Sequence, residues 1–235
     1  MAAAGATLNE WLERDLDGKM RRTADRPLPA GRISPDEALI GGAGMAGLGL
    51  GTLYFGVHAP AAFLAAATLA LYLFVYTPMK RWTSFNTFVG AIPGAIPPLI
   101  GFSAGRGRIE FEGWALFSIL FLWQIPHFMA IAWRYREDYR RAGFRMLPCF
   151  DESGRVTGLV SVLYCVVLLP VSLTPVYFEA AGWFYGAGAI LLGLGYTFFA
   201  ALFAYAPSMP SARNLFLSSI LYLPFLLILL VSDFR

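Results

Sequence analysis

The chain has 235 residues, of which 57% are hydrophobic and only 14% are charged. Soluble globular domains are about 45–50% apolar, so this composition and a mean hydropathy of +0.59 exclude a soluble globule and indicate a membrane protein. The formal net charge of +3 is small and unevenly spread. The distribution of charge therefore bears on membrane topology, and the small net charge does not indicate a nucleic-acid partner. Cys149 and Cys165 form no C-x-x-C pair, and we expect buried thiols rather than a disulfide or zinc site.

The N-terminal segment carries the first chemical signal. Asn9, Glu13 and Asp17 are spaced i, i+4, i+8, so a helix would present them on one face. Their mutual repulsion would be relieved by Mg²⁺, which takes one or two protein carboxylates together with water and phosphate oxygens. Arg22 and Arg26 follow closely and suit a phosphate anion. Two interpretations stay open at this point: a diphosphate site, or a solvated helix end beside a basic loop.

Residues 1–8 are apolar but shorter than the roughly 20 residues of a membrane span, and they lack the charged start of a signal peptide. We expect the chain to begin within a helix, with membrane segments of longer relatives missing upstream. Beyond them the apolar pattern predicts seven full spans. These are expected near 35–57, 60–78, 86–104, 114–133, 156–178, 182–205 and 212–231.

Local signals refine these spans. Ser34 is the expected N-cap of the first span, because Pro35 and two acids follow it. Gly47-x-x-x-Gly51 predicts close packing of that helix against a neighbour. Prolines at 93, 97 and 98 predict a kinked or broken helix in the third span.

Lysine and arginine concentrate in alternate connections of the predicted bundle. They gather in 19–36, 79–86, 134–155 and 206–213, whereas the other connections and the C-terminus hold only Arg106, Arg108 and Arg235. The positive-inside rule then places the basic connections on the cytoplasmic side. Carboxylates and arginines beside an apolar cavity suit a reaction in which a diphosphate leaves a lipid-soluble chain.

Several motifs resemble the intramembrane (UbiA-type) prenyltransferases. Asn9-Glu10-x-x-Glu13-x-x-x-Asp17 is similar to their first aspartate-rich motif, N-D-x-x-D-x-x-x-D, with glutamate at two positions. The second motif is commonly D-x-x-x-D, but here tyrosines occupy that frame and Glu137-Asp138 are the acids. Further segments resemble the protoheme IX farnesyltransferase (haem O synthase) branch: Asp17 to Leu28, Tyr76-Thr77-x-x-Lys80-Arg81, Trp123 to Phe128, and Asp138-Tyr139-x-x-Ala142-Gly143-x-x-Met146-Leu147-Pro148.

The resemblance implies an all-α, multi-pass transmembrane helix bundle with nine helices in the family, of which this chain would hold about seven full spans and one partial helix. Residues 1–235 would form a single integral-membrane prenyltransferase domain. The implied reaction moves farnesyl from farnesyl diphosphate to a vinyl group of protoheme IX, giving haem O and diphosphate for haem A biosynthesis. Membrane lipid is an expected partner, and a haem A synthase is a further one. The implied location is a bacterial inner or mitochondrial inner membrane, with the site on the cytoplasmic or matrix side.

The resemblance also implies roles for individual residues. Asn9, Glu13 and Asp17 would be catalytic residues that bind Mg²⁺ and diphosphate, supported by Glu10 and Asp15, and Asp138 would supply a second metal site. On charge and location, four basic residues would bind the diphosphate: Arg22, Arg26, Lys80 and Arg134.

Several alternatives remain open. His127 either approaches the haem or is a hydrogen-bonded histidine of the bundle. The acceptor is either protoheme or an aromatic acid that is a quinone precursor. A transporter is a third possibility, although its charged groups would be expected near the middle of several spans rather than at helix ends.

Overall fold

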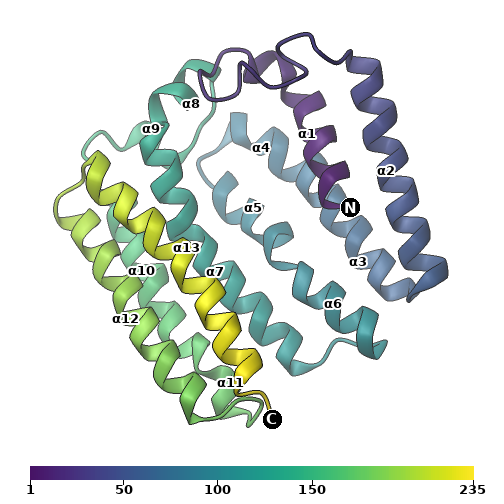
Figure 1. The fold of residues 1–235 in the computed structure, drawn as a ribbon. Helices are drawn as coiled ribbons and strands as arrows, with labels where there is room; N and C mark the ends of the chain where they lie inside the picture. Colours follow the sequence, from purple (N-terminus) through teal and green to yellow (C-terminus); the bar gives the residue numbers. More distant parts are fainter. The chain divides into compact units, whose positions relative to one another are not determined.

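The computed structural model describes all 235 residues, and it is all-α, as expected (Figure 1). The only β feature is an isolated bridge between Ala181 and Phe234. In chain order the elements are α1 (Ala2–Asp17), α2 (Pro35–Gly56), α3 (Ala59–Ala70), the π-helix η1 (Leu71–Tyr76), α4 (Thr77–Trp82), α5 (Asn86–Ala95), α6 (Pro97–Arg106), α7 (Phe111–Arg134), α8 (Arg136–Ala142), α9 (Leu147–Phe150), α10 (Arg155–Ser172), α11 (Thr174–Tyr177), α12 (Trp183–Tyr205) and α13 (Met209–Ser232).

Seven helical stretches are long and apolar enough to cross a membrane, which confirms the expected number of full spans. They are Pro35–Gly56, Ala59–Trp82, Asn86–Arg106, Phe111–Arg134, Arg155–Tyr177, Trp183–Tyr205 and Met209–Ser232. Large apolar side chains on these helices face outward, among them Phe55, Leu48 and Val231, which are 88%, 75% and 79% exposed. Because water would disfavour so much exposed apolar surface, the chain is an integral, multi-pass membrane protein.

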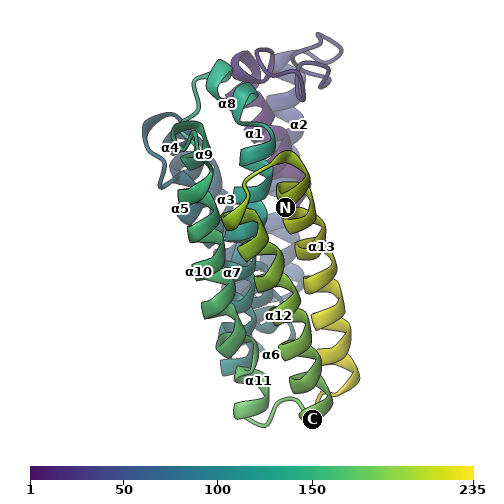
Figure 2. The same ribbon diagram turned by 90° about the vertical axis from the view of Figure 1, so that its left-hand side faces the viewer.

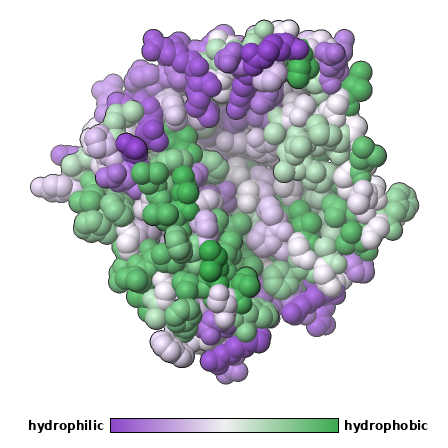
Figure 3. All heavy atoms as spheres, viewed as in Figure 1, coloured by the Kyte–Doolittle hydropathy of each residue, from purple (hydrophilic) through white to green (hydrophobic).

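The chain divides into two compact units. The first unit comprises residues 1–110 and 136–149, and the second comprises residues 111–135 and 150–235. In Figure 3 hydrophilic residues gather over the connection between α1 and α2 in the first unit, while hydrophobic residues cover much of α12 and α13 in the second. The single domain over residues 1–235 stays a prediction.

In the first unit α2 packs against α1 and α3, and its start is capped as predicted. The hydroxyl of Ser34 accepts from the Glu37 amide at 3.2 Å, and the Glu37 carboxylate accepts from the Ser34 amide at 2.8 Å. The predicted contact through Gly47 and Gly51 is wrong, because a Cβ at either would meet nothing within 4 Å. Gly42 makes the close contact instead, since a Cβ there would lie 2.8 Å from Leu8 on α1.

Proline breaks the third span as predicted. α5 ends at Ala95 and α6 begins at Pro97, while Pro93 lies within α5. The second span is also irregular, because its middle turn, η1, is π-helical. Short π-helical segments are rare and frequently occur at functional sites. Here η1 leads directly into α4.

In the second unit α7, α10, α12 and α13 form a four-helix bundle, and Figure 2 shows them running alongside one another. The core holds buried tyrosines whose hydroxyls are all hydrogen-bonded: Tyr185 to the Ser172 carbonyl, Tyr222 to the Ser172 hydroxyl and Tyr196 to the Trp123 carbonyl. Satisfied hydroxyls make these residues compatible with an apolar core. Cys149 and Cys165 are free and buried, as expected.

Replacing Gly158 with alanine should destabilise the second unit. A Cβ at Gly158 on α10 would lie 2.4 Å from the Ala204 Cα on α12, and overpacking of this kind costs about 1–3 kcal/mol. Gly195→Ala on α12 is the matched control, because a Cβ there meets nothing within 4 Å and alanine favours a helix by roughly 0.5–1 kcal/mol over glycine. We expect the midpoint temperature of thermal unfolding in detergent to fall for Gly158→Ala only. Equal shifts for the two variants would contradict this packing.

Candidate functional site

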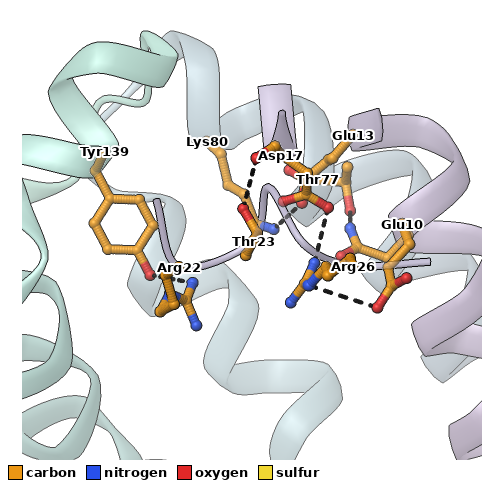
Figure 4. A network of polar contacts seen from close by, with 10 residues as sticks. Glu10, Glu13, Asp17, Arg22, Thr23, Arg26, Thr77, Lys80 and Tyr139 are labelled. Atoms are coloured by element: carbon orange, nitrogen blue, oxygen red, sulfur yellow. Dashed lines mark hydrogen bonds and ion pairs between the residues drawn. The ribbon is translucent and has the colours of Figure 1, made fainter. Parts of the chain in front are cut away.

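One face of α1 carries three buried polar side chains, as the i, i+4, i+8 spacing predicted. Asn9, Glu13 and Asp17 are only 6%, 5% and 1% exposed. Burying carboxylates costs several kcal/mol each unless they are paired. Their partners therefore determine whether this face is a solvated helix end or a site, and Figure 4 shows those partners.

Two of the partners come from α4. The Asn9 side-chain amide donates to the Thr77 hydroxyl at 2.9 Å, and the Lys80 ammonium donates to Glu13 Oε2 at 2.7 Å. Thr77 and Lys80 are three residues apart, so they lie on one face of α4. Lys80 is itself only 8% exposed. The acids and the lysine thus form a buried polar contact, which excludes the solvated helix end.

The third partner folds back from the loop after α1. The Arg26 guanidinium donates to Asp17 Oδ2 at 2.8 Å and lies 3.6 Å from a Glu10 oxygen. The loop is held in this conformation by Thr23, whose hydroxyl donates to the Asp17 carbonyl at 2.8 Å. Thr23 is 1% exposed, so this turn is a fixed part of the first unit.

The hydrogen bonds of this face leave oxygen atoms that a cation would bind. Oε1 of Glu13 is buried and has no hydrogen-bond partner, which is unfavourable for a carboxylate oxygen. Asn9 donates through its nitrogen and Asp17 accepts through Oδ2, so each retains one further oxygen. No group of three or more His, Cys, Asp or Glu side chains is placed to hold a metal ion. The donor set, two carboxylates and an amide, instead fits Mg²⁺ that shares its coordination with phosphate oxygens.

The second predicted acidic cluster, Glu137-Asp138, lies on α8, and its neighbour Tyr139 contacts the loop after α1. An Arg22 guanidinium nitrogen donates to the Tyr139 hydroxyl at 3.2 Å (Figure 4). Burial raises the pKa of Tyr139, so its hydroxyl stays neutral and accepts this bond. The neighbouring Asp138 accepts from Arg141 at 2.7 Å and its side chain is 12% exposed. Asp138 therefore has a cation as partner, and its role in metal binding stays a prediction.

The connection after α8 is fixed directly to Lys80. The Arg145 amide donates to the Lys80 carbonyl at 2.6 Å, and the side-chain amide of Asn86 donates to the Arg145 carbonyl at 3.1 Å. Asn86 is fully buried at the start of α5. These bonds tie α4, α5 and the segment after α8 into one support for the site.

Sequence reasoning missed the positioning role of η1 and Thr77. The Thr77 hydroxyl donates to the Tyr72 carbonyl at 2.8 Å, five residues back, while it accepts from Asn9. The Tyr76 ring lies 4.7 Å from the Lys80 ammonium and is held by α5, since a Cβ at Gly90 would lie 2.4 Å from it. The only signal in the sequence was Thr77, a small polar residue between the aromatic-rich segment 71–76 and Lys80.

Two predicted site residues belong to the second unit. His127 on α7 makes a 2.7 Å hydrogen bond to the Ser219 hydroxyl on α13, and its role toward the haem stays a prediction. Arg134 ends α7 with its guanidinium carbon 5.7 Å from the Phe216 ring centre. The other predicted residues, from Asn9 to Lys80 and Asp138, all lie in the first unit.

Replacing Lys80 with methionine should destabilise the first unit by about 3–5 kcal/mol, because removing one partner of a buried ion pair leaves the other charge uncompensated. Adding Glu13→Gln should recover part of that loss. Arg81→Met, at the exposed neighbouring position, is the control and should have little effect. Denaturation in mixed micelles measures the wild type, the Lys80→Met and Glu13→Gln variants, the double variant and the Arg81→Met control. Additive effects of the Glu13 and Lys80 changes would contradict a coupled pair.

Comparisons with known proteins give the chain its family. The model of the UbiA prenyltransferase family matches residues 1–220. A protoheme IX farnesyltransferase of Solibacter usitatus (strain Ellin6076) is 48% identical over 233 residues, which are 99% of this chain and 80% of that protein. A protoheme IX farnesyltransferase of Salinibacter ruber (strain DSM 13855 / M31) is 45% identical over 232 residues, with coverage of 99% and 82%.

Solved structures agree in fold. One, described as digeranylgeranylglyceryl phosphate synthase in membranes, superposes with a TM-score of 0.78 at 17% identity and covers 98% of this chain and 80% of its own. The apo structure of a UbiA homolog from Aeropyrum pernix K1 gives 0.73 at 18% identity, with coverage of 97% and 84%. The buried acid face, the helical architecture and the match over nearly the whole chain lead to one conclusion: this chain belongs to the UbiA prenyltransferase family.

Proposed function

We propose that the protein transfers a farnesyl group from farnesyl diphosphate to a vinyl group of protoheme IX. The farnesyl carbon bonds to the outer vinyl carbon as diphosphate leaves, and water adds to the carbocation left on the inner vinyl carbon, giving haem O, diphosphate and a proton. The observation that carries the proposal is the 48% identity over 99% of the chain to a relative named for this activity. The buried acid and cation face on α1 and α4 supports the diphosphate half of the reaction. No residue in the structure favours an aromatic acid or transport over this reaction.

We assign binding of the diphosphate to the basic side chains of the first unit. Lys80 carries three N–H donors, of which Glu13 takes one. Arg26 carries five, of which Asp17 takes one. The remaining donors, with those of Arg22, bind phosphate oxygens. Asn9, Glu13 and Asp17 would hold Mg²⁺, with Asp138 as the acid of a second site. When bound, Mg²⁺ offsets the negative charge that grows on the departing diphosphate.

The surroundings of these charges suit a cationic prenyl group. Tyr76 presents its ring to the Lys80 ammonium at 4.7 Å, a geometry in which an aromatic face stabilises positive charge. Tyr72 stacks on Tyr76 with 5.6 Å between ring centres. These rings and the apolar helices around them keep water from the carbon that loses diphosphate.

We place the site at the cytoplasmic face of a bacterial inner membrane or the matrix face of the mitochondrial inner membrane, because lysine and arginine concentrate in the connections that carry it. Membrane lipid surrounds the seven spans, and farnesyl diphosphate and protoheme IX are the substrates. Association with a haem A synthase stays a prediction.

Glu13→Gln and Asp17→Asn should each lower farnesyl transfer by about 10²–10³-fold, the usual cost of removing one electrostatic contact to a developing charge. The assay incubates membranes with Mg²⁺, farnesyl diphosphate and protoheme and measures haem O. Chelating divalent cations should stop the reaction. Asp25→Asn is the control, because Asp25 pairs with Arg32 on the surface. Undiminished turnover in the two acid variants would refute the assignment.

Asp138→Asn tests the second acid separately. If Asp138 binds a metal, its loss should raise the Mg²⁺ concentration for half-maximal activity by about 10–100-fold. Arg141→Gln is the matched control, because it removes the same 2.7 Å ion pair but leaves the carboxylate. Equal effects of the two variants would show that Asp138 acts only through that ion pair.

A further inference from the structure

His127 is held on three sides within the second unit. Its Nδ1 lies 2.7 Å from the Ser219 hydroxyl. Its ring stacks on Trp123, with 5.1 Å between centres, and lies 5.1 Å from the Phe216 ring. Trp123 is fixed in turn, since its indole N–H donates to the Ser219 carbonyl at 2.8 Å. The imidazole therefore has a defined orientation between α7 and α13.

The hydroxyl of Ser219 determines which imidazole nitrogen carries the proton. That hydroxyl donates to the Phe216 carbonyl at 2.5 Å. A serine hydroxyl has a single proton, so toward His127 it accepts, and Nδ1 must be the N–H donor. Nε2 is then unprotonated and carries a lone pair. In this tautomer a histidine binds a metal through Nε2 while its other nitrogen is fixed by a hydrogen bond.

Arg134 lies two helical turns from His127 on the same face of α7, because both side chains contact Phe216. Seven residues correspond to about 10.5 Å along a helix. Arg134 is partly buried at the end of the span and makes no ion pair with an acid. A metal-binding nitrogen inside the span and a cation at its end suit a planar iron complex whose carboxylates stay at the membrane surface.

We propose that Nε2 of His127 is an axial ligand of the protoheme iron, that Ser219 is the positioning residue that fixes its tautomer, and that Arg134 pairs with a haem propionate rather than with the diphosphate. The inference rests on the proposed function, because it names the subsite of the acceptor. Histidine is the common protein ligand of haem iron. The chain contains only one other histidine, His58, in the first unit.

The test titrates the purified full chain with ferric protoheme IX in nanodiscs without farnesyl diphosphate, and follows optical and electron paramagnetic resonance spectra. The wild type should give a histidine-ligated spectrum that His127→Ala loses and His58→Ala retains. Added imidazole should restore it in His127→Gly, which separates lost ligation from lost folding. A histidine-ligated spectrum in His127→Ala would overturn the inference.

Ser219→Ala should give a mixture of ligated and unligated spectra at saturating haem, because the imidazole proton is no longer fixed. Ser218→Ala is the matched control, since its hydroxyl bonds the Leu215 carbonyl in the same helix and not His127. Ser219→Thr, which retains the hydroxyl, should recover the ligated spectrum. A wild-type spectrum in Ser219→Ala would remove Ser219 from the assignment.

Arg134→Ala should weaken protoheme binding by about tenfold or more, the usual effect of losing a charge-assisted hydrogen bond. It should leave binding of the protoheme dimethyl ester unchanged, because the ester lacks the carboxylates. Arg213→Ala, an exposed arginine of the same unit, is the control. Equal weakening for acid and ester would contradict a propionate contact, as would weaker binding of pyrophosphate by Arg134→Ala.

These results are separable from the proposed function. Farnesyl transfer by the wild type together with an unchanged haem spectrum in His127→Ala would reject the ligand assignment and leave the function standing. Haem binding through His127 without any farnesyl transfer would reject the function and leave the subsite.

Discussion

The buried ion pair between Glu13 and Lys80 is the interaction on which the site depends. It joins α1 to α4 with a 2.7 Å hydrogen bond in surroundings that expose only 5% and 8% of the two residues. Such a pair must offset several kcal/mol of desolvation per ion, yet one Glu13 oxygen remains without a partner. A face that is fully buried and only partly satisfied is high in energy without a ligand, and a cation bound there would relieve that cost.

The helices and the loop around this ion pair are joined by hydrogen bonds that hold its side chains in place. The π-helical turn η1 leads into α4, and its Tyr72 carbonyl accepts from the Thr77 hydroxyl that bonds Asn9 on α1. The bonds from Asn86 and Arg145 fix the backbone of Lys80 against α5 and the segment after α8. The loop after α1 returns Arg26 to Asp17. Rigid elements thus position each charge, which is what electrostatic stabilisation of a leaving group requires, because the charges need not reorganise during the reaction.

Sequence predicted the helices well, because length, hydropathy and capping are local properties. All seven spans and the Ser34 cap were predicted, and so was the common face of Asn9, Glu13 and Asp17. What it could not predict depends on contacts between distant residues. Gly47 and Gly51 have the spacing for close packing, but the rotation of α2 brings Gly42 against α1 instead. Likewise, the partner of Glu13 is 67 residues away, and that of His127 is 92.

Binding of Mn²⁺ in place of Mg²⁺, followed by electron paramagnetic resonance with and without inorganic pyrophosphate, tests the central claim most directly. The claim is that the buried face of α1 binds a divalent cation together with a diphosphate. The wild type should immobilise Mn²⁺ when pyrophosphate is present, and the Asn9→Ala and Glu13→Gln variants should not. The same pyrophosphate-dependent uptake in all three proteins would contradict the account.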